Sequence, residues 1–80
     1  MPKIHVQYFA VLREQRGLGE EVIDTPARTP AELYKELQTR HRLTLPIGTL
    51  RFAVNDEFAE MDRALSDGDS VVFLTPVAGG

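Results

Sequence analysis

The chain has 80 residues and a formal net charge of −3 at pH 7, with 42% hydrophobic and 26% charged residues. This length suits a single small domain, and the composition is that of a globular protein, not of a disordered one. The chain has no Cys, which excludes a disulfide framework, a thiolate nucleophile and Cys-based metal sites. Its acidic balance argues against nucleic-acid binding, which requires a basic face.

The N-terminal segment is predicted to be a half-buried strand. Ile4, Val6 and Tyr8 alternate with polar residues over positions 3 to 8, and this period of two is typical of a strand with one buried face. A signal peptide would need a continuous apolar stretch instead. We therefore expect a cytoplasmic protein that does not enter a membrane.

Two short elements are expected next. Residues 10–16 are compatible with a helical turn that ends at Gly17 and Gly19, because glycine readily adopts the conformation that ends a helix. Residues 20–25 place Val22 and Ile23 among acidic residues, which predicts a second strand that pairs with the first.

The main helix is predicted to begin at Thr29. A Thr at this position can cap the free N–H groups, Pro30 suits the first helical turn, and Glu32 can return a bond to the Thr29 amide. Leu33 and Leu37 then form a one-sided apolar stripe beside Tyr34. The predicted helix ends at three residues that suit its negative pole, Arg40, His41 and Arg42.

The C-terminal half is predicted to add three strands. A loop over 43–48 should tuck its Leu and Ile side chains under the sheet, and a strand should follow over 50–54. Asn55-Asp56 is turn chemistry that leads into a short edge strand at 57–59. The last strand, 70–75, is almost continuously apolar, which predicts a central strand covered on both faces.

The predicted elements make an α+β fold in which a mixed sheet of about five strands packs on one main helix. Side chains that could bind a metal or act in catalysis are sparse. Asp67 and Asp69 flank a glycine in what is most often a turn, and the two histidines, His5 and His41, fall on separate elements. We therefore predict no metal site, and no Ser is placed to act as an activated nucleophile.

The C-terminus carries the strongest functional signal. Pro76 stops the last strand because it has no N–H to donate. The five residues after position 75 span about 17 Å when extended, enough to place the terminal carboxylate in the active site of another protein. Gly79 and Gly80 have no side chains, so a narrow channel could accept them. The alternative is a frayed end without function.

Five blocks that span the whole chain carry a family resemblance: Tyr8-Phe9-Ala10, Leu12-Arg13-Glu14, Ala53-Val54-Asn55, Leu65-Ser66-Asp67-Gly68-Asp69 and Pro76-Val77-Ala78-Gly79-Gly80. With these blocks the chain resembles the ubiquitin-like β-grasp sulfur carriers of the MoaD/ThiS type, and most closely the small subunits of molybdopterin synthase. One departure is Thr75, where the family usually has a second proline.

The resemblance implies a β-grasp domain over 1–75 and a flexible tail over 76–80. It implies that an adenylyltransferase of the ubiquitin-activating type uses ATP to adenylate the Gly80 carboxylate, which a sulfur donor then converts to a thiocarboxylate. The large subunit of a heterotetrameric synthase would take up the tail and use that sulfur to build the dithiolene of molybdopterin. The chain itself would bind no cofactor, and the catalytic side chains would belong to the large subunit. The absence of Cys agrees, since it leaves the C-terminus as the place for transferable sulfur.

The resemblance also implies a docking surface on the face of the sheet opposite to Ile4, Val6 and Tyr8. The matching positions are Phe9, Phe58 and Leu74, with Arg13 as a polar contact and Pro76, Val77 and Ala78 in the tail. The alternative is that the apolar members are core residues of a second covered face.

Two other functions stay open at this point. A related sulfur carrier for thiamine biosynthesis or tRNA thiolation would have the same tail chemistry and a different acceptor. A non-catalytic β-grasp binding module would carry its Gly-Gly end incidentally, and deletion of Gly80 would then leave function intact.

Overall fold

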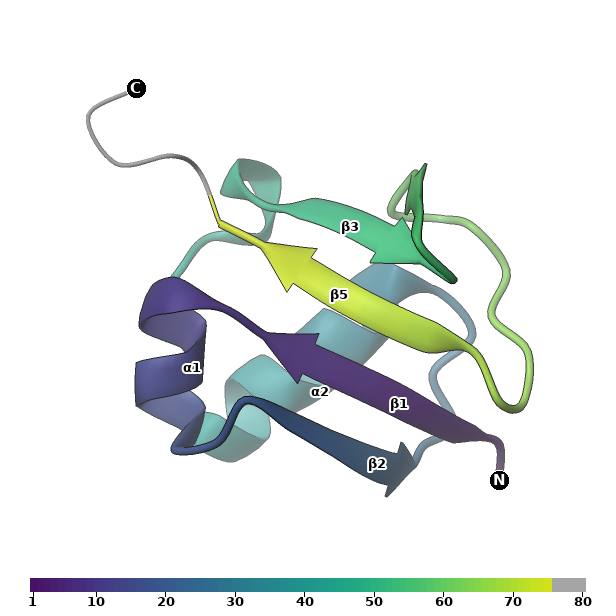
Figure 1. Cartoon of the computed structure of the whole chain (residues 1–80), viewed down its shortest axis with the longest axis horizontal. Coiled ribbons are helices and arrows are strands. Elements are labelled where there is room, and N and C mark those ends of the chain that lie inside the picture. The colour runs from purple at the N-terminus through teal and green to yellow at the C-terminus, as the bar shows by residue number, and fades with distance from the viewer. Residues whose placement is uncertain (76–80) are drawn as a thin grey trace.

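The structure is a computed structural model that describes residues 1–75. Five strands form one sheet in the order β2-β1-β5-β3-β4, and α2 lies across one face of it (Figure 1). β1 and β5 are parallel, whereas the other neighbouring strands are antiparallel. The predicted α+β arrangement is confirmed, with each strand boundary within one residue of its prediction. The elements are β1 (Lys3–Tyr8), α1 (Ala10–Arg16), β2 (Glu20–Asp24), α2 (Pro30–His41), the 3₁₀ helix η1 (Ile47–Thr49), β3 (Arg51–Val54), β4 (Glu57–Ala59) and β5 (Ser70–Leu74).

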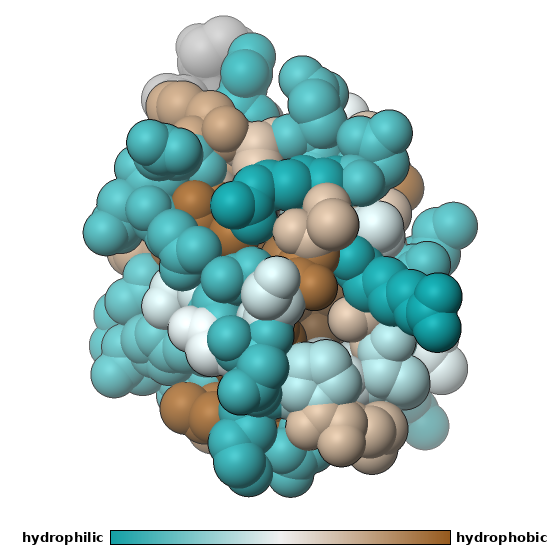
Figure 2. All heavy atoms as spheres, turned by 90° about the vertical axis from the view of Figure 1, so that its right-hand side faces the viewer, coloured by the Kyte–Doolittle hydropathy of each residue, from teal (hydrophilic) through white to brown (hydrophobic). Residues whose placement is uncertain are grey.

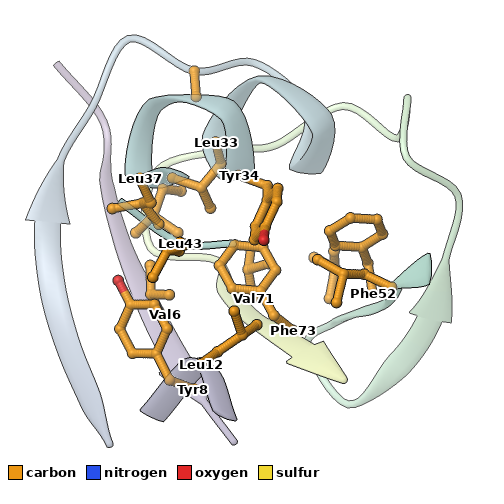
Figure 3. Close-up of a cluster of buried hydrophobic side chains, with 14 residues drawn as sticks. Val6, Tyr8, Leu12, Leu33, Tyr34, Leu37, Leu43, Phe52, Val71 and Phe73 are labelled. Atoms are coloured by element: carbon orange, nitrogen blue, oxygen red, sulfur yellow. The ribbon is translucent and has the colours of Figure 1, made fainter. Parts of the chain in front are cut away.

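The core lies between the sheet and α2. The predicted buried face of β1 is confirmed, since Ile4, Val6 and Tyr8 point into the core and are at most 1% exposed. Phe73 of β5 is at the centre, and its ring lies 5.3 Å from that of Tyr34 on α2 and 5.6 Å from that of Phe52 on β3, both in edge-to-face geometry (Figure 3). Such pairs add to the stabilisation from burial, so these three rings help to fix α2 on the sheet.

The start of α2 confirms the predicted cap and corrects one of its bonds. Thr29 Oγ1 accepts a hydrogen bond from the Glu32 N–H at 3.2 Å, as expected of an N-cap. The Glu32 carboxylate, however, accepts from the Arg28 N–H at 2.9 Å and not from that of Thr29. Arg28 lies in an irregular segment, where its N–H has no strand or helix partner, and this bond satisfies it.

The two predicted turns are confirmed as turns. Asn55 and Asp56 both have positive φ, 53° and 69°, as a two-residue hairpin turn requires. The Asp69 carboxylate accepts hydrogen bonds from the Asn55 amide at 2.9 Å and from the Ser66 N–H at 2.8 Å. These bonds, that of Asn55 foremost, hold the pKa of Asp69 below its ordinary value. The carboxylate therefore ties the last turn to the hairpin.

The loop before β3 is as predicted in its packing but not in its backbone. Leu43 is 3% exposed, and Leu45 and Ile47 pack against the core. Ile47–Thr49, however, form the short helix η1 where a loop was predicted. A segment of three residues is too short to show a helical period in the sequence.

The prediction that β5 is covered on both faces is wrong. β5 is central in the order of strands, and Val71 and Phe73 are fully buried. Val72 and Leu74 are only half-buried, because α2 covers one face of the sheet and no element among residues 1–75 covers the other (Figure 1). The apolar run of β5 therefore has two parts: Val71 and Phe73 belong to the core, and Val72 and Leu74 lie on the face of the sheet that nothing in residues 1–75 covers.

Candidate functional site

The open face of the sheet carries a row of paired residues that crosses four strands and is apolar on three of them, β5, β3 and β4. Gln7 of β1 pairs with Val72 of β5, Val72 with Ala53 of β3, and Ala53 with Phe58 of β4. Paired residues point to the same side of a sheet, and this side is opposite to the buried Val71 and Phe73. Phe58, at the edge strand, is 75% exposed, so the row ends in a large apolar side chain in contact with solvent.

A second pair of apolar residues lies next to this row. Tyr8 pairs with Phe73 in the parallel ladder of β1 and β5, which places the next residues, Phe9 and Leu74, side by side on the open face. Phe9 is 47% exposed and Leu74 is half-buried. The structure thus brings together the three apolar residues predicted to form the docking surface, and Phe9 and Phe58 are not core residues. We call Phe9, Ala53, Phe58, Val72 and Leu74 the open apolar face.

Arg13 lies at the border of this face, as predicted. It is exposed on α1 and lines a shallow hollow together with Gln7, Phe9 and Glu20. Its guanidinium group lies over Gly19, where an added Cβ would be 3.3 Å from Arg13 Nε. The absence of a side chain at Gly19 therefore leaves space for the Arg13 guanidinium group at this position.

An ion-pair network, which sequence reasoning missed, fixes the position of α1. The Glu21 carboxylate accepts hydrogen bonds from Arg16 Nε and Nη2, both at 2.8 Å, and from the Tyr8 hydroxyl at 2.6 Å. The hydrogen bond from Arg16 is the main cause of the lowered pKa of Glu21. The pKa of the Tyr8 hydroxyl is raised, chiefly by its burial and secondly by its hydrogen bond to Glu21. The available signal was strand parity, which puts Glu21 beside Val6 on the inner side of β2.

The two ends of the molecule differ in character. β5 ends at Leu74, which pairs with Arg51 at the start of β3, close to η1 (Figure 1). The predicted tail residues Pro76, Val77, Ala78, Gly79 and Gly80 lie outside the described residues. The opposite end, which contains the N-terminus and the turn before β5, is mostly hydrophilic, with apolar atoms only in small separate areas (Figure 2).

Within residues 1–75, no group of three or more His, Asp or Glu side chains could hold a metal ion. His5 lies on the open side of β1, with Nδ1 3.4 Å from Ser70 Oγ and Nε2 3.4 Å from Glu20 Oε2. In the same part of the chain, no helix is both long enough and apolar enough to span a membrane.

This five-stranded sheet, with one main helix and an open apolar face, defines a ubiquitin-like β-grasp protein. Residues 6–80 match the model of the ThiS family, and the chain belongs to that family of MoaD/ThiS proteins.

Full-length relatives define its place in the family more closely. The molybdopterin synthase sulfur carrier subunit of Escherichia coli (strain K12) is 38% identical over 96% of this chain and 99% of its own length. The subunit of the same name from Mycobacterium tuberculosis is 35% identical over the full length of both chains. A solved complex of subunits 1 and 2 of the molybdopterin-converting factor from Helicobacter pylori contains a chain that is similar with a TM-score of 0.67 and 28% identity, over 98% of this chain and 99% of that one.

Proposed function

We propose that this chain is the sulfur carrier subunit of a molybdopterin synthase and that it carries sulfur as a thiocarboxylate on Gly80. Full-length similarity to two sulfur carrier subunits of that enzyme supports the proposal. The sequence ends in Gly79-Gly80 and has no Cys, so the terminal carboxyl group is the position at which this chain can hold sulfur covalently.

The chemistry follows from the low reactivity of a carboxylate. An adenylyltransferase of the ubiquitin-activating type joins the Gly80 carboxylate to the α-phosphate of ATP and releases pyrophosphate. Hydrosulfide then attacks the acyl carbon and displaces AMP, which leaves the thiocarboxylate. ATP is bound and used by the activating enzyme, and the carrier itself needs no cofactor. The synthase large subunit transfers the sulfur to a pterin precursor, and two deliveries supply the two sulfur atoms of the dithiolene.

The observation that carries the proposal is the position of the open apolar face. Leu74 belongs to this face and is also the last residue of β5, so the face continues directly into the segment that ends in Gly79-Gly80. A partner that covers Phe9, Phe58 and Leu74 therefore lies where the chain continues toward its reactive end. Arg13 supplies a charged contact at the border, and the tail residues Pro76, Val77 and Ala78 enter the partner. The Helicobacter pylori complex of subunits 1 and 2 supports a partner of this kind.

The carrier chemistry is tested by intact-mass spectrometry. The protein is incubated with ATP, an activating enzyme and a sulfide source, and we expect a mass change that corresponds to replacement of one oxygen by sulfur at Gly80. Deletion of Gly80, or addition of one residue after it, should abolish the change without altering the thermal unfolding midpoint. If no adduct forms with an enzyme proven active on another carrier, the proposal is wrong.

The docking surface is tested by Phe58→Asp. Phe58 is largely exposed, so the substitution should leave the fold intact and weaken binding of the large subunit in calorimetry, because a charge would be buried in an apolar interface. Val22→Asp is the matched control, since Val22 is 64% exposed on β2 at the other edge of the sheet. Equal affinities of the Phe58 variant and the wild-type chain would refute the assigned surface.

A further inference from the structure

The chain turns sharply between β1 and α1, and Ala10 is the residue at which it turns (Figure 1). Phe9 has an extended backbone, with φ −130° and ψ 156°, whereas Ala10 has a φ of 52°. This is the left-handed region, which residues with a Cβ atom rarely occupy because Cβ comes too close to the following carbonyl oxygen. The chain therefore accepts a conformational cost at Ala10.

The conformation of Ala10 does not follow from its own residue type. The other residues of the described chain with a left-handed φ occur where that conformation is usual, in glycines, in a hairpin turn or at the end of a helix: Gly17, Gly68, Asn55, Asp56 and Arg42. Alanine has neither the freedom of glycine nor a polar side chain that could stabilise the turn by a local hydrogen bond. The surrounding structure must therefore impose the conformation of Ala10.

Contacts on both sides of Ala10 fix the two segments that meet there. Tyr8 before the turn and Arg16 at the end of α1 both donate hydrogen bonds to the Glu21 carboxylate, at 2.6 and 2.8 Å. Leu12, in the first turn of α1, is fully buried in the core. A strained residue persists only where its surroundings over-determine the backbone, and these contacts do so on either side of Ala10.

The turn directs two apolar side chains to opposite sides of the sheet. Phe9 is 47% exposed on the open apolar face, whereas Leu12 enters the core. The left-handed region of an alanine is only about 20° wide in φ, while a glycine can move from it into a range of φ that is closed to alanine. An alanine held in this narrow region therefore leaves the neighbouring Phe9 less freedom than a glycine would.

We propose that Ala10 is a positioning residue, which holds Phe9 in its exposed place on the open apolar face before any partner binds. The inference rests on the proposed function, because the surface that contains Phe9 is assigned there to the large subunit. Ala10 acts through Phe9 and takes no part in the transfer of sulfur. A surface that already has its bound conformation loses less conformational entropy on association, so the cost in fold stability at Ala10 is offset by tighter binding.

Ala10→Gly tests this inference first in the free chain. Glycine removes the steric cost at this φ, so the midpoint of thermal unfolding should rise by about 3–5 °C. The Phe9 amide should become more mobile, with an NMR order parameter that falls from about 0.85 toward 0.6. Ala10→Asn is the matched variant, because asparagine keeps the Cβ atom and occupies the left-handed region more readily than alanine. In this variant the Phe9 amide should stay as rigid as in the wild-type chain.

Binding to the purified large subunit is then measured by calorimetry. Ala10→Gly should bind about threefold more weakly, with the loss in the entropy of binding, because the backbone entropy that separates glycine from alanine corresponds to a factor of this size. Ala10→Asn should bind like the wild-type chain. Arg42→Gly is the control for added stability, since it relieves a left-handed residue at the end of α2, on the other side of the sheet (Figure 1), and should leave the affinity unchanged.

The outcomes separate this inference from the proposed function. Wild-type affinity of Ala10→Gly would overturn the inference and leave the carrier function standing. Weaker binding of that variant with an unchanged order parameter at Phe9 would also overturn it, because loss of a methyl contact would then be the cause. Equal weakening in Ala10→Asn would contradict it too, since this variant keeps the narrow left-handed region. A wild-type chain that neither binds the large subunit nor forms the thiocarboxylate would refute the proposed function, whereas the measurement on the free chain would still test how Phe9 is held.

Discussion

Replacement of Glu21 by Gln should destabilise the fold more than other surface changes on β2. The carboxylate accepts three short hydrogen bonds, two from Arg16 and one from Tyr8. Hydrogen bonds to a charged group contribute about 1.5–3 kcal/mol each when buried. The Glu21 side chain is 17% exposed and that of Arg16 is 22% exposed, so solvent screening reduces the sum. We expect a loss of about 2 kcal/mol, or a fall of about 10 °C in the unfolding midpoint of a domain of this size.

A double-mutant cycle isolates the ion pair. Arg16→Met keeps much of the aliphatic length of the side chain and removes its charge. The unfolding free energies of Arg16→Met, Glu21→Gln and the double variant, measured by guanidinium titration, should give a coupling energy of about 1–2 kcal/mol. Additive effects, with a coupling below about 0.3 kcal/mol, would refute the claim that this pair anchors α1. Glu20→Gln is the neighbouring control, because Glu20 is exposed.

The pH dependence of the coupling has a definite sign. The pKa of Glu21 is lower in the folded state than its ordinary value, mainly because of Arg16. The folded state therefore binds fewer protons than the unfolded state. The stabilisation is fully present above the ordinary Glu value of about 4.3 and is lost as the pH falls below it. A coupling energy that stayed constant under acidic conditions would contradict this account.

Three further changes test the helix ends and the protonation of His41. Thr29→Ala should lower the free energy of unfolding by about 1 kcal/mol in a denaturant titration, and an unchanged midpoint would show that the N-cap bond is dispensable. Arg42→Gly should raise the free energy of unfolding by about 0.5–1 kcal/mol, because Arg42 ends α2 in the left-handed region, at φ 56°, which glycine adopts more easily. A loss of stability would contradict this. Burial and then Arg16 lower the pKa of His41, so stability should decrease as the pH falls through about 6.5. His41→Gln should flatten this slope between pH 5 and 7, and an identical slope would assign it to another group.

Much of the fold could be predicted from the sequence because the signals are local. Alternation over Ile4, Val6 and Tyr8 depends on neighbouring residues alone, and so does the cap at Thr29. The turn at Asn55 and Asp56 follows from the backbone preferences of those two residue types. The residues predicted to form a docking surface lie on the side of the sheet that strand parity predicts, because the period of two assigns Phe9 and Leu74 to one face regardless of what covers it.

Local residue patterns were sufficient to predict the order of the elements and the parity of each strand, and the Gly-Gly end is read directly from the residues. Tertiary structure alone decided how far Val72 and Leu74 are exposed, because an apolar run looks the same whether a helix covers it or nothing in the chain does. It also decided that Glu21, rather than Glu20, binds Arg16. A hollow lined by Gly48, Thr49, Phe58 and Met61 also exists only in the folded chain, because these residues come from segments too far apart in the sequence for any local pattern to reveal it.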